Sequence, residues 1–332
     1  RGAEMTTGVV VIGRNEGERL RRCLASVVGQ AEAVVYVDSG STDGSVSIAN
    51  SFGFQVLSLD PKTPFSAARA RNEGFDLLTR EHPAIRFVQF VDGDCTVASG
   101  WLAVASAALD ERAERAAVLG HVSEANPDNT VFNRLCALEW KSGTGDIENF
   151  GALGGIFMAR VEVFRQLGGF NRDVIAGEDS ELGVRMSLAG FRVTKIDQPM
   201  VCHDANMTRF AQWWKRAVRA GHAIGQRAFL NGDTPARDCV RERKSTWCWG
   251  IGLPLVVLLF LIPSHGASLL LLAAYGVLGW RVYRFRKNMG DSPADALLYA
   301  RYLILAKIAN GLGLLKFYWN RLFKRYRIIE YK

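Results

Sequence analysis

Short apolar runs that end in polar turns recur through the first hundred residues of this chain. Three of them are Gly8–Gly13, Ala33–Val37 and Arg86–Val91. Asp38 directly follows the second run, and Asp92 directly follows the third. Runs that are largely apolar at consecutive positions are typical of strands buried on both faces in a parallel sheet. Because segments with helical spacing lie between the runs, the sequence predicts βαβ units and an α/β fold.

Acidic residues stand where the third run ends. Asp92 and Asp94 are separated only by Gly93. Ligands of open α/β sheets bind beyond the carboxyl ends of the strands, and two such carboxylates can reach a divalent cation together with a ribose or a phosphate. A short acidic turn without a ligand is the alternative for this motif by itself, but its place at a strand end favours the metal site.

The segment after the second run, Asp38–Gly44, is rich in Ser, Thr and Gly. One interpretation is a turn that caps a helix through Ser41 or Thr42. That interpretation does not explain Asp38 at the tip of the strand. A carboxylate at this place suits hydrogen bonds from the edge of a nucleobase.

Three further charged residues lie on predicted helices. Arg71 is either an ordinary solvated arginine or one that binds a diphosphate or lies near the metal carboxylates. Glu178 and Asp179 open a helix after a glycine, where the helix dipole favours acidic side chains. The same dipole keeps a carboxylate ionised, which a general base requires.

Two other groups allow more than one interpretation. His203 follows a predicted strand, and a lone histidine is more often structural than a metal ligand. Trp213 and Trp214 precede the basic residues Arg216 and Arg219 at helical spacing. Such a helix meets membrane headgroups, or it forms a platform for a diphosphate or a sugar acceptor, and the two roles are compatible.

Two apolar segments near the C-terminus, Trp247–Pro263 and Ala267–Trp280, contain no Asp, Glu, Lys or Arg. Basic clusters stand outside them, which accounts for much of the net charge of +8: Arg237–Lys244, Arg281–Lys287 and Asn320–Arg327. The positive-inside rule then predicts a membrane hairpin over about 247–283 with both ends in the cytoplasm. Each segment is close to the minimum length of a span, so a hairpin that dips in without crossing is also consistent. A buried helical hairpin of a soluble domain is the alternative.

The remaining composition narrows the class of protein. The apolar stretch over about 297–319 is interrupted by basic residues, which favours an amphipathic interfacial helix over a third span. No nucleic-acid-binding signature accompanies the positive charge, so we expect no nucleic-acid partner. The six cysteines are scattered without a CxxC pair, which argues against a zinc site or a disulfide framework and fits a reducing cytosol.

Taken in order along the chain, five motifs resemble those of the family-2 glycosyltransferases. These enzymes have the GT-A fold, the Rossmann-like fold of the nucleotide-diphospho-sugar transferases. Each motif alone is unspecific, but the ordered set is specific and covers about residues 7–204. The motifs are Val9–Glu16, Val37–Gly44, Ala70–Gly74, Asp92–Asp94 and Gly177–Leu182.

The resemblance implies a nucleotide-sugar donor, with Mn²⁺ or Mg²⁺ and an inverting transfer. It favours a UDP-sugar, with a GDP-sugar as the alternative. It implies that Asp179, with Glu178 beside it, is the general base. Asp94 would hold the metal with Asp92 nearer the ribose or sugar, and His203 would complete the metal shell. The implied donor site consists of Gly13, Arg14, Glu16, Asp38, Ser39, Arg71, Asp92, Gly93 and Asp94.

Two departures from the family pattern bear on the product. The second motif has the single carboxylate Asp38 where the family usually has Asp-Asp. Processive synthases carry Gln-x-x-Arg-Trp, whereas this chain has Gln212-Trp-Trp-Lys-Arg216. The second departure favours a single transfer over polymer synthesis.

The combined expectation is a GT-A domain over residues 1–235, including the basic tryptophan-bearing helix, followed by a helical membrane-associated region over 236–332. Its function would be the transfer of one sugar to a lipid-linked or membrane-surface glycan at the cytoplasmic face of the plasma membrane. The acceptor residues would be Trp213, Trp214, Arg216 and Arg219. A non-catalytic membrane adaptor of the same fold and a sugar nucleotidyltransferase are the alternatives.

Overall fold

The computed structural model describes residues 6–148 and 153–324, which form two compact units. The first unit takes in the chain up to residue 126 together with 139–206, and the second takes in 127–138 and the chain from 207 onward. The division therefore falls near residue 206 rather than at the expected 235. The physical reason is that helix α8 (Phe210–Asn231) packs along α12 (Pro293–Leu322) and so belongs with the C-terminal helices.

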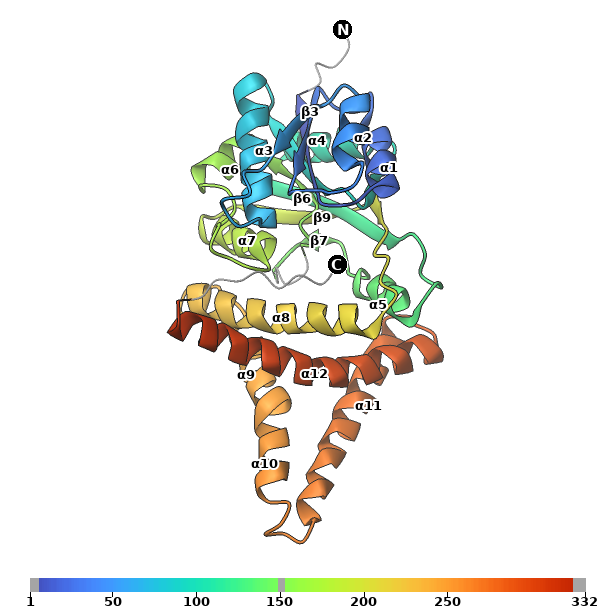
Figure 1. The fold of residues 1–332 in the computed structure, drawn as a ribbon, viewed down its shortest axis with the longest axis vertical. Coiled ribbons are helices and arrows are strands. Elements are labelled where there is room, and N and C mark those ends of the chain that lie inside the picture. The colour runs from blue at the N-terminus through green and yellow to red at the C-terminus, as the bar shows by residue number, and fades with distance from the viewer. Residues whose placement is uncertain (1–5, 149–152, 325–332) are drawn as a thin grey trace. The chain divides into compact units, whose positions relative to one another are not determined.

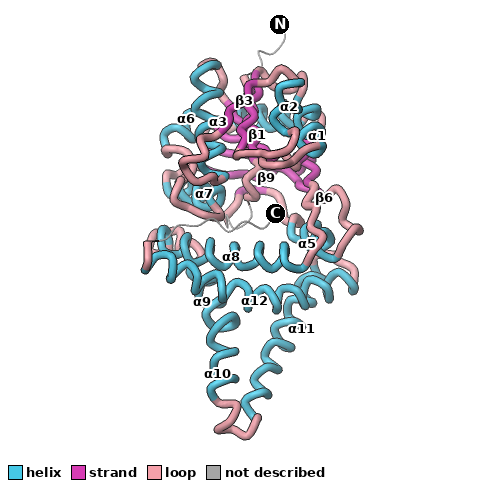
Figure 2. The backbone as a smooth tube through the Cα atoms, in the orientation of Figure 1, coloured by secondary structure: helices cyan, strands magenta, loops and turns pink. Residues whose placement is uncertain are grey.

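The first unit is built on a mixed sheet. The described residues give it nine strands in the order β3-β2-β1-β4-β8-β6-β9-β5, with β7 paired to β9. The strands are β1 (Thr7–Gly13), β2 (Ala33–Asp38), β3 (Gln55–Ser58), β4 (Phe87–Asp92), β5 (Cys95–Val97), β6 (Arg115–Glu124), β7 (Gly145–Asp146), β8 (Phe157–Arg160) and β9 (Arg192–His203). All of them lie in the first unit (Figure 2).

The predicted parallel sheet is present over β3, β2, β1 and β4, but the rest of the sheet is mixed. β8 runs antiparallel to both β4 and β6, whereas β6 and β9 are parallel. Parallel neighbours need a crossover of a dozen or more residues. Only two residues separate β4 from β5, so β5 cannot be a parallel neighbour of β4. It pairs antiparallel with β9 at the far edge of the sheet.

Helices cover the sheet of the first unit (Figure 1). On α1, the apolar residues Leu20, Cys23, Leu24 and Val27 are buried, as their spacing predicts. The helices are α1 (Glu18–Val27), α2 (Ser45–Ser51), α3 (Ala67–Glu81), α4 (Trp101–Glu111), α6 (Val161–Gln166) and α7 (Glu178–Leu188). Apolar side chains of these helices and of the sheet form one continuous core.

The second unit is helical. Besides α8 and α12 it contains α5 (Val131–Glu139), α9 (Val240–Thr246), the π-helical η2 (Trp247–Gly252), α10 (Leu253–Leu259), the 3₁₀-helical η3 (Ala267–Leu272) and α11 (Ala273–Asn288). The backbones of α8 and α12 approach closely at small residues. A Cβ added at Gly313 would lie 1.9 Å from the carbonyl oxygen of Val218. Close packing through glycine is common where helices associate in membranes.

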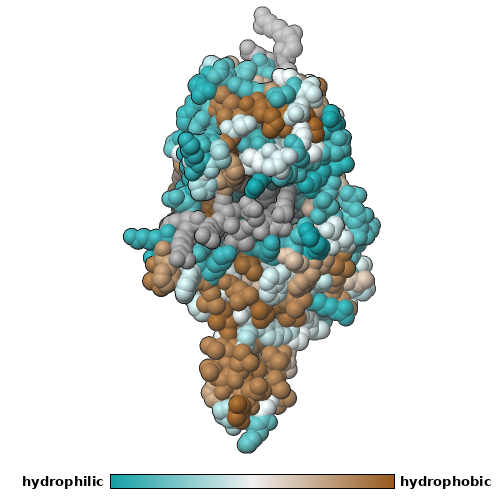
Figure 3. Space-filling view, viewed as in Figure 1, coloured by the Kyte–Doolittle hydropathy of each residue, from teal (hydrophilic) through white to brown (hydrophobic). Residues whose placement is uncertain are grey.

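Residues 247–288 form a helical hairpin within the second unit, as the sequence predicts. One limb is η2 and α10, and the other is η3 and α11. The Ser268 hydroxyl donates to the carbonyl of Val257 at 2.9 Å, and the Tyr275 hydroxyl donates to the carbonyl of Trp249. Apolar side chains nevertheless cover much of its outer surface (Figure 3).

Among the helices of residues 6–148 and 153–324, α12 alone is long and apolar enough to cross a membrane, and 28% of its most apolar window is buried. The interfacial helix expected over 297–319 is thus the central part of one 30-residue helix that packs on α8. The basic tail expected over 320–327 lies partly outside the described residues.

Candidate active site

Two loops at the ends of β1 and β2 interlock through hydrogen bonds. The backbone N–H of Asn15 donates to the hydroxyl oxygen of Ser41 at 2.9 Å, and the backbone N–H of Thr42 donates to Asn15 Oδ1 at 2.7 Å. The Ser45 hydroxyl oxygen accepts from the backbone of Gly17 at 3.1 Å. The first two motifs of the chain therefore form a single structure.

The predicted donor residues of the first loop have different environments. Glu16 is buried and forms an ion pair with Arg19 at 2.8 Å. Arg14 is exposed, with its guanidinium 5.8 Å from the centre of the Phe65 ring. The carbonyl of Gly13 accepts a hydrogen bond from the backbone of Ser39 at 3.0 Å. Arg14 is thus the charged side chain of this loop that solvent reaches.

Asp38 is buried and organises its own loop. Its Oδ2 accepts from the backbone N–H groups of Gly40 and Ser41 at 3.0 and 2.9 Å, and its Oδ1 accepts from the Tyr36 hydroxyl at 3.0 Å. Burial and the neighbouring Asp38 raise the pKa of Tyr36 far above its usual value, so this hydroxyl stays protonated. The contact of Asp38 with a nucleobase stays a prediction.

The alternative in which Ser41 or Thr42 caps a helix is wrong. Helix α2 begins at Ser45, and Gly44 is its N-cap residue. Ser41 and Thr42 instead bind Asn15 of the neighbouring loop, because the parallel pairing of β1 and β2 brings the two loops together.

Arg71 on α3 joins two of the predicted motifs. Its Nη2 lies 2.7 Å from Asp92 Oδ1, and its Nη1 lies 2.6 Å from Glu178 Oε1. Burial by itself would lower the pKa of Arg71, but the carboxylates of Asp92, Glu178 and Asp179 outweigh burial and raise it above its usual value. The guanidinium is therefore a fixed positive charge between three carboxylates.

Asp179 lies in the first turn of α7 and is buried. Its Oδ2 accepts a hydrogen bond from the backbone N–H of Gly155 at 3.1 Å. Gly155 has a φ of +72°, and a Cβ at this residue would lie 2.3 Å from Arg71 Nη2. Only glycine fits here, and its N–H fixes the orientation of the Asp179 carboxylate.

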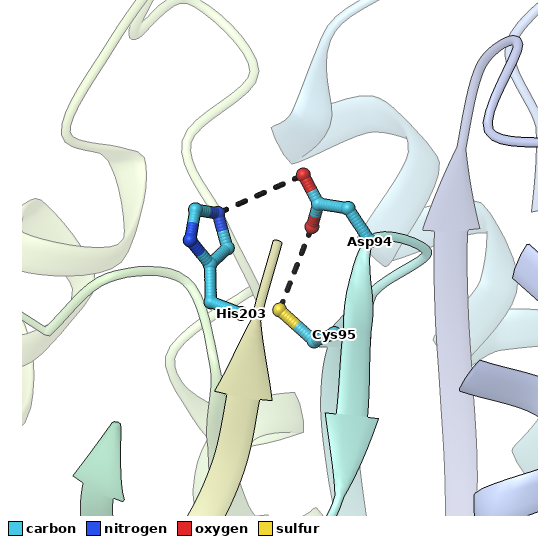
Figure 4. A group of neighbouring side chains, drawn as sticks. All are labelled: Asp94, Cys95 and His203. Carbon is cyan, nitrogen blue, oxygen red and sulfur yellow. Dashed lines mark hydrogen bonds and ion pairs between the residues drawn. The ribbon is translucent and has the colours of Figure 1, made fainter. Parts of the chain in front are cut away.

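Asp94, Cys95 and His203 form a cluster at the end of β9 (Figure 4). His203 Nε2 lies 3.7 Å from Asp94 Oδ2, and Cys95 Sγ lies 3.5 Å from Asp94 Oδ1. On the other side of the ring, His203 Nδ1 lies 3.1 Å from Glu124 Oε2. Strand pairing explains the grouping, because Cys95 and Glu124 are the partners of His203 on β5 and β6.

These donors fit a divalent cation. A metal-bound histidine commonly donates its second ring N–H to a carboxylate, and Glu124 stands in that place for His203. Imidazole nitrogen and carboxylate oxygen are both ligands of first-row divalent ions. Asp92, the other carboxylate of the motif, is bound to Arg71 and is not part of the cluster. Gly93, which lies between Asp92 and Asp94 in the chain, donates its backbone N–H to the carbonyl of Ile12 at 2.8 Å.

The predicted acceptor residues lie on α8 in the second unit, where one of them is part of the core. Trp213 is buried, and its ring centre lies 4.9 Å from that of Tyr302 on α12. Burial leaves Trp213 no open face, so it does not form a platform. Trp214, Arg216 and Arg219 are partly exposed, and Arg216 Nη1 lies 3.8 Å from the Cys136 sulfur.

The sequence motifs do not include three residues of the candidate site: Cys95, Glu124 and Gly155. Cys95 directly follows the Asp-Gly-Asp motif, but only its pairing with His203 brings the thiol into the cluster. Glu124 ends a strand that the sequence pattern does not define. Gly155 lies just before β8, and a glycine has no side chain that would mark it as part of a site.

The chain is similar to known glycosyltransferases. Residues 8–168 match the model of glycosyl transferase family 2, and residues 144–209 match a second model, described as the N-terminal domain of galactosyltransferase. The glycosyltransferase AglE of Haloferax volcanii is 26% identical over 232 residues, which cover 64% of this chain and 71% of that protein.

Two solved structures share the fold. One is the mannosyltransferase PcManGT of Pyrobaculum calidifontis, described in complex with GDP-Man and Mn²⁺, with a TM-score of 0.59 and 19% identity over 96% of this chain and 89% of that chain. The other is S. aureus TarS 1-349, with a TM-score of 0.53 and 18% identity over 97% of this chain and 93% of that chain. The predicted GT-A fold is confirmed.

Proposed function

Since the chain belongs to the family-2 glycosyltransferases, we propose that it transfers one sugar from a nucleotide-sugar donor to a lipid-linked or membrane-surface glycan, with inversion at the anomeric carbon. The observation that carries this proposal is the position of Arg71. Its guanidinium binds Asp92 of the Asp-Gly-Asp motif and Glu178 beside the proposed base, so the two motifs belong to one site.

The interlocked loops at β1 and β2 hold the nucleoside in this proposal. Arg14 is exposed at the rim of these loops, where its charge attracts the diphosphate. The backbone around Asp38 and Ser39 forms a rigid surface on which the nucleobase lies, since Asp38 accepts two backbone hydrogen bonds. We propose a UDP-sugar as donor, with a GDP-sugar as the alternative to be tested beside it.

Asp94 and His203 hold the divalent cation, Mn²⁺ or Mg²⁺. When bound, the cation supplies positive charge to the departing nucleoside diphosphate. Glu124 fixes the orientation of the His203 ring from the opposite side. Arg71 keeps the Asp92 carboxylate in place at the edge of the site.

Asp179 is the general base. It accepts the proton of the acceptor hydroxyl while that oxygen forms a bond to the anomeric carbon, and the bond between this carbon and the diphosphate oxygen breaks on the opposite face. A single displacement inverts the configuration. The Gly155 N–H orients the Asp179 carboxylate before the reaction.

The hairpin anchors the chain at the cytoplasmic face of the plasma membrane. Along one limb, basic residues such as Lys244 are followed by Trp247 and then by aliphatic residues; along the other, the aliphatic residues are followed by Trp280 and then by Arg281. Basic residues would then lie at the lipid headgroups, tryptophan at the interface and aliphatic residues in the hydrocarbon core of the bilayer. η2 has 6 residues and α10 has 7, so together they extend about 20 Å, less than the roughly 30 Å of a hydrocarbon core. The hairpin therefore enters the bilayer without crossing it.

One residue of the basic cluster Arg281–Lys287 does not face lipid headgroups but is buried in the second unit. Arg286 is buried, where it binds Asp291 and donates to the carbonyl of Leu138 at 3.0 Å. Arg281 and Arg284 are exposed and are the cations of α11 that meet anionic lipid in this proposal.

A screen of UDP- and GDP-sugars tests the function. The full chain in detergent with Mn²⁺ or Mg²⁺ is incubated with each donor and an extract of lipid-linked glycans, and the release of nucleoside diphosphate and the labelled lipid are both measured. We expect one donor to give labelled lipid, and EDTA to abolish the labelling. Absence of transfer with every donor, from a protein that also fails to bind any of them, would contradict the proposal.

A further inference from the structure

Cys95 gives the cluster a sulfur ligand that transfer does not require. We propose that Asp94, Cys95 and His203 form a binding site for Zn²⁺, with one thiolate, one imidazole and one carboxylate as ligands. The scattered cysteines of the sequence argue against a zinc site, but strand pairing brings together residues that are far apart in the chain. Zinc binding itself does not depend on the proposed transfer.

The sheet places the three side chains on one face. Cys95 and His203 are direct partners in the antiparallel pairing of β5 and β9, so their side chains project on the same side. Asp94 immediately precedes β5, and its backbone carbonyl accepts from the N–H of Asp204 at 2.9 Å. Backbone hydrogen bonds therefore hold the ligands in position before an ion arrives.

The distances suit a small tetrahedral ion. Zn²⁺ bonds of about 2.0–2.3 Å hold neighbouring ligand atoms about 3.3–3.8 Å apart. Cys95 Sγ lies 3.5 Å from Asp94 Oδ1, and His203 Nε2 lies 3.7 Å from Asp94 Oδ2, the other oxygen of the same carboxylate. With one ligand atom taken from each residue, all three lie within 4.8 Å of one another, so a small inward shift of the side chains completes the site. A fourth position is then filled by water or by a phosphate oxygen, as in zinc sites with three protein ligands.

The chemistry of the donors selects the ion. Thiolate and imidazole favour Zn²⁺ over Mg²⁺, which prefers oxygen ligands and retains several waters. In the tautomer in which His203 Nδ1–H donates to Glu124, 3.1 Å away, Nε2 on the side of Asp94 is the ring nitrogen that binds a metal. On binding, the Cys95 thiol loses its proton to solvent and its sulfur forms the bond to Zn²⁺, so one proton is released per ion.

Zinc bound in this way excludes the catalytic cation. Asp94 and His203 are the residues that hold Mn²⁺ or Mg²⁺ in the proposed reaction, and one ion occupies both ligands at a time. Zn²⁺ is therefore an inhibitor that competes with the catalytic cation. This consequence, unlike zinc binding itself, rests on the proposed function.

Co²⁺ is a spectroscopic substitute for Zn²⁺ and tests the site without an activity assay. The full chain is titrated with Co²⁺, and near-ultraviolet absorption is recorded for the sulfur-to-cobalt charge-transfer band. We expect the wild type to show this band and to lose it when Zn²⁺ is added. Cys95→Ser should lack the band and bind Zn²⁺ at least tenfold more weakly, because loss even of an outer-shell partner costs about 10–100-fold in affinity.

Cys202→Ser is the matched control. Cys202 precedes His203 on β9 and pairs with Thr96, so its side chain lies on the opposite face of the sheet. This variant should keep the band and the affinity of the wild type. Retention of the band in Cys95→Ser, or its loss in Cys202→Ser alone, would overturn the assignment.

Zinc-edge X-ray absorption identifies the atoms bound to zinc in the wild type, so this test does not depend on whether a variant folds. With one equivalent of Zn²⁺ we expect one sulfur neighbour at about 2.3 Å beside nitrogen and oxygen ligands. A shell of nitrogen and oxygen alone would overturn the proposal, whether or not the chain proves to be a transferase. Conversely, a sulfur ligand in a protein that transfers no sugar would leave the zinc site standing and reject only the inhibition.

Discussion

The guanidinium of Arg71 lies 2.6 Å from the Glu178 carboxylate, although 107 positions separate the two residues in the chain. The same guanidinium binds Asp92 at 2.7 Å. One buried cation therefore connects α3, the end of β4 and the start of α7. Removal of this guanidinium would leave the carboxylates of Asp92 and Glu178 without their positively charged partner.

Replacement of Arg71 with Met should destabilise the first unit by about 3–5 kcal/mol, because it leaves partly or fully buried carboxylates without their ion pairs. Urea unfolding of the full chain in detergent measures the change. Arg80→Met is the control on the same helix, since the side chain of Arg80 is 68% exposed. It should change the stability by less than about 0.5 kcal/mol. Equal stability of the two variants would show that the bridge contributes nothing.

Asp179→Asn should lower the rate of sugar transfer by about 10²–10⁴ while donor binding stays within a few-fold of the wild type, since only the base is lost. Turnover and calorimetric donor binding are measured side by side. The exposed Asp173 lies on the loop before α7, and Asp173→Asn should transfer sugar at the wild-type rate. Near-normal turnover by Asp179→Asn would reject the assignment of the base.

Gly155→Ala should impair both the base and its neighbour. The added methyl group would lie 2.3 Å from Arg71 Nη2, and the residue would have to keep a φ of +72°. We expect a loss of about 1–3 kcal/mol in stability together with slower turnover, because the N–H that holds Asp179 moves. Gly143→Ala, where an added Cβ meets nothing within 4 Å, is the control. If the two variants behave alike in unfolding and transfer assays, the close packing at Gly155 is unimportant.

Acid should destabilise the second unit through His222. Burial, with smaller effects from Lys316 and Arg219, lowers the pKa of His222 from 6.5 to about 4. Between these two values the unfolded chain binds more protons than the folded one, so stability is lost as the pH falls from about 6.5 to about 4. The contribution is about 3 kcal/mol at most. Melting temperatures over this range should fall less steeply for His222→Phe, and parallel slopes for variant and wild type would contradict the prediction.

Charges placed on the hairpin should release the chain from membranes. Leu258, Ile262 and Leu270 are 67%, 85% and 78% exposed, so replacement of all three with Glu costs little packing within the unit. We expect the triple variant to lose flotation with anionic vesicles. Val28, Val104 and Leu188 are exposed in the first unit, and their triple replacement with Glu should leave flotation unchanged.

Truncation after Lys244 is a less specific test of the same anchor. It would also remove α12, against which α8 buries one face. Any loss of membrane binding would then be mixed with misfolding of the second unit. Flotation of the hairpin triple variant equal to that of the wild type would reject the anchor.

The sequence alone determines the parallel half of the sheet, the helices that cover it and the hairpin, because periodicity reports which faces of each element are apolar. It also predicts the carboxylates of the candidate site, since Asp94 and Asp179 stand at the ends of elements where ligands bind. The family resemblance adds the reaction class, which no spacing by itself provides.

Only the tertiary structure decides which of these residues meet. Asp92 and Asp94 are two positions apart, yet one binds Arg71 and the other faces His203. Cys95 and Glu124 become partners of His203 through strand register, and Trp213 is removed to the core by the packing of α8 on α12. The physical reason is that local patterns fix burial within an element, whereas strand order and helix pairing are set by contacts between residues distant in the chain.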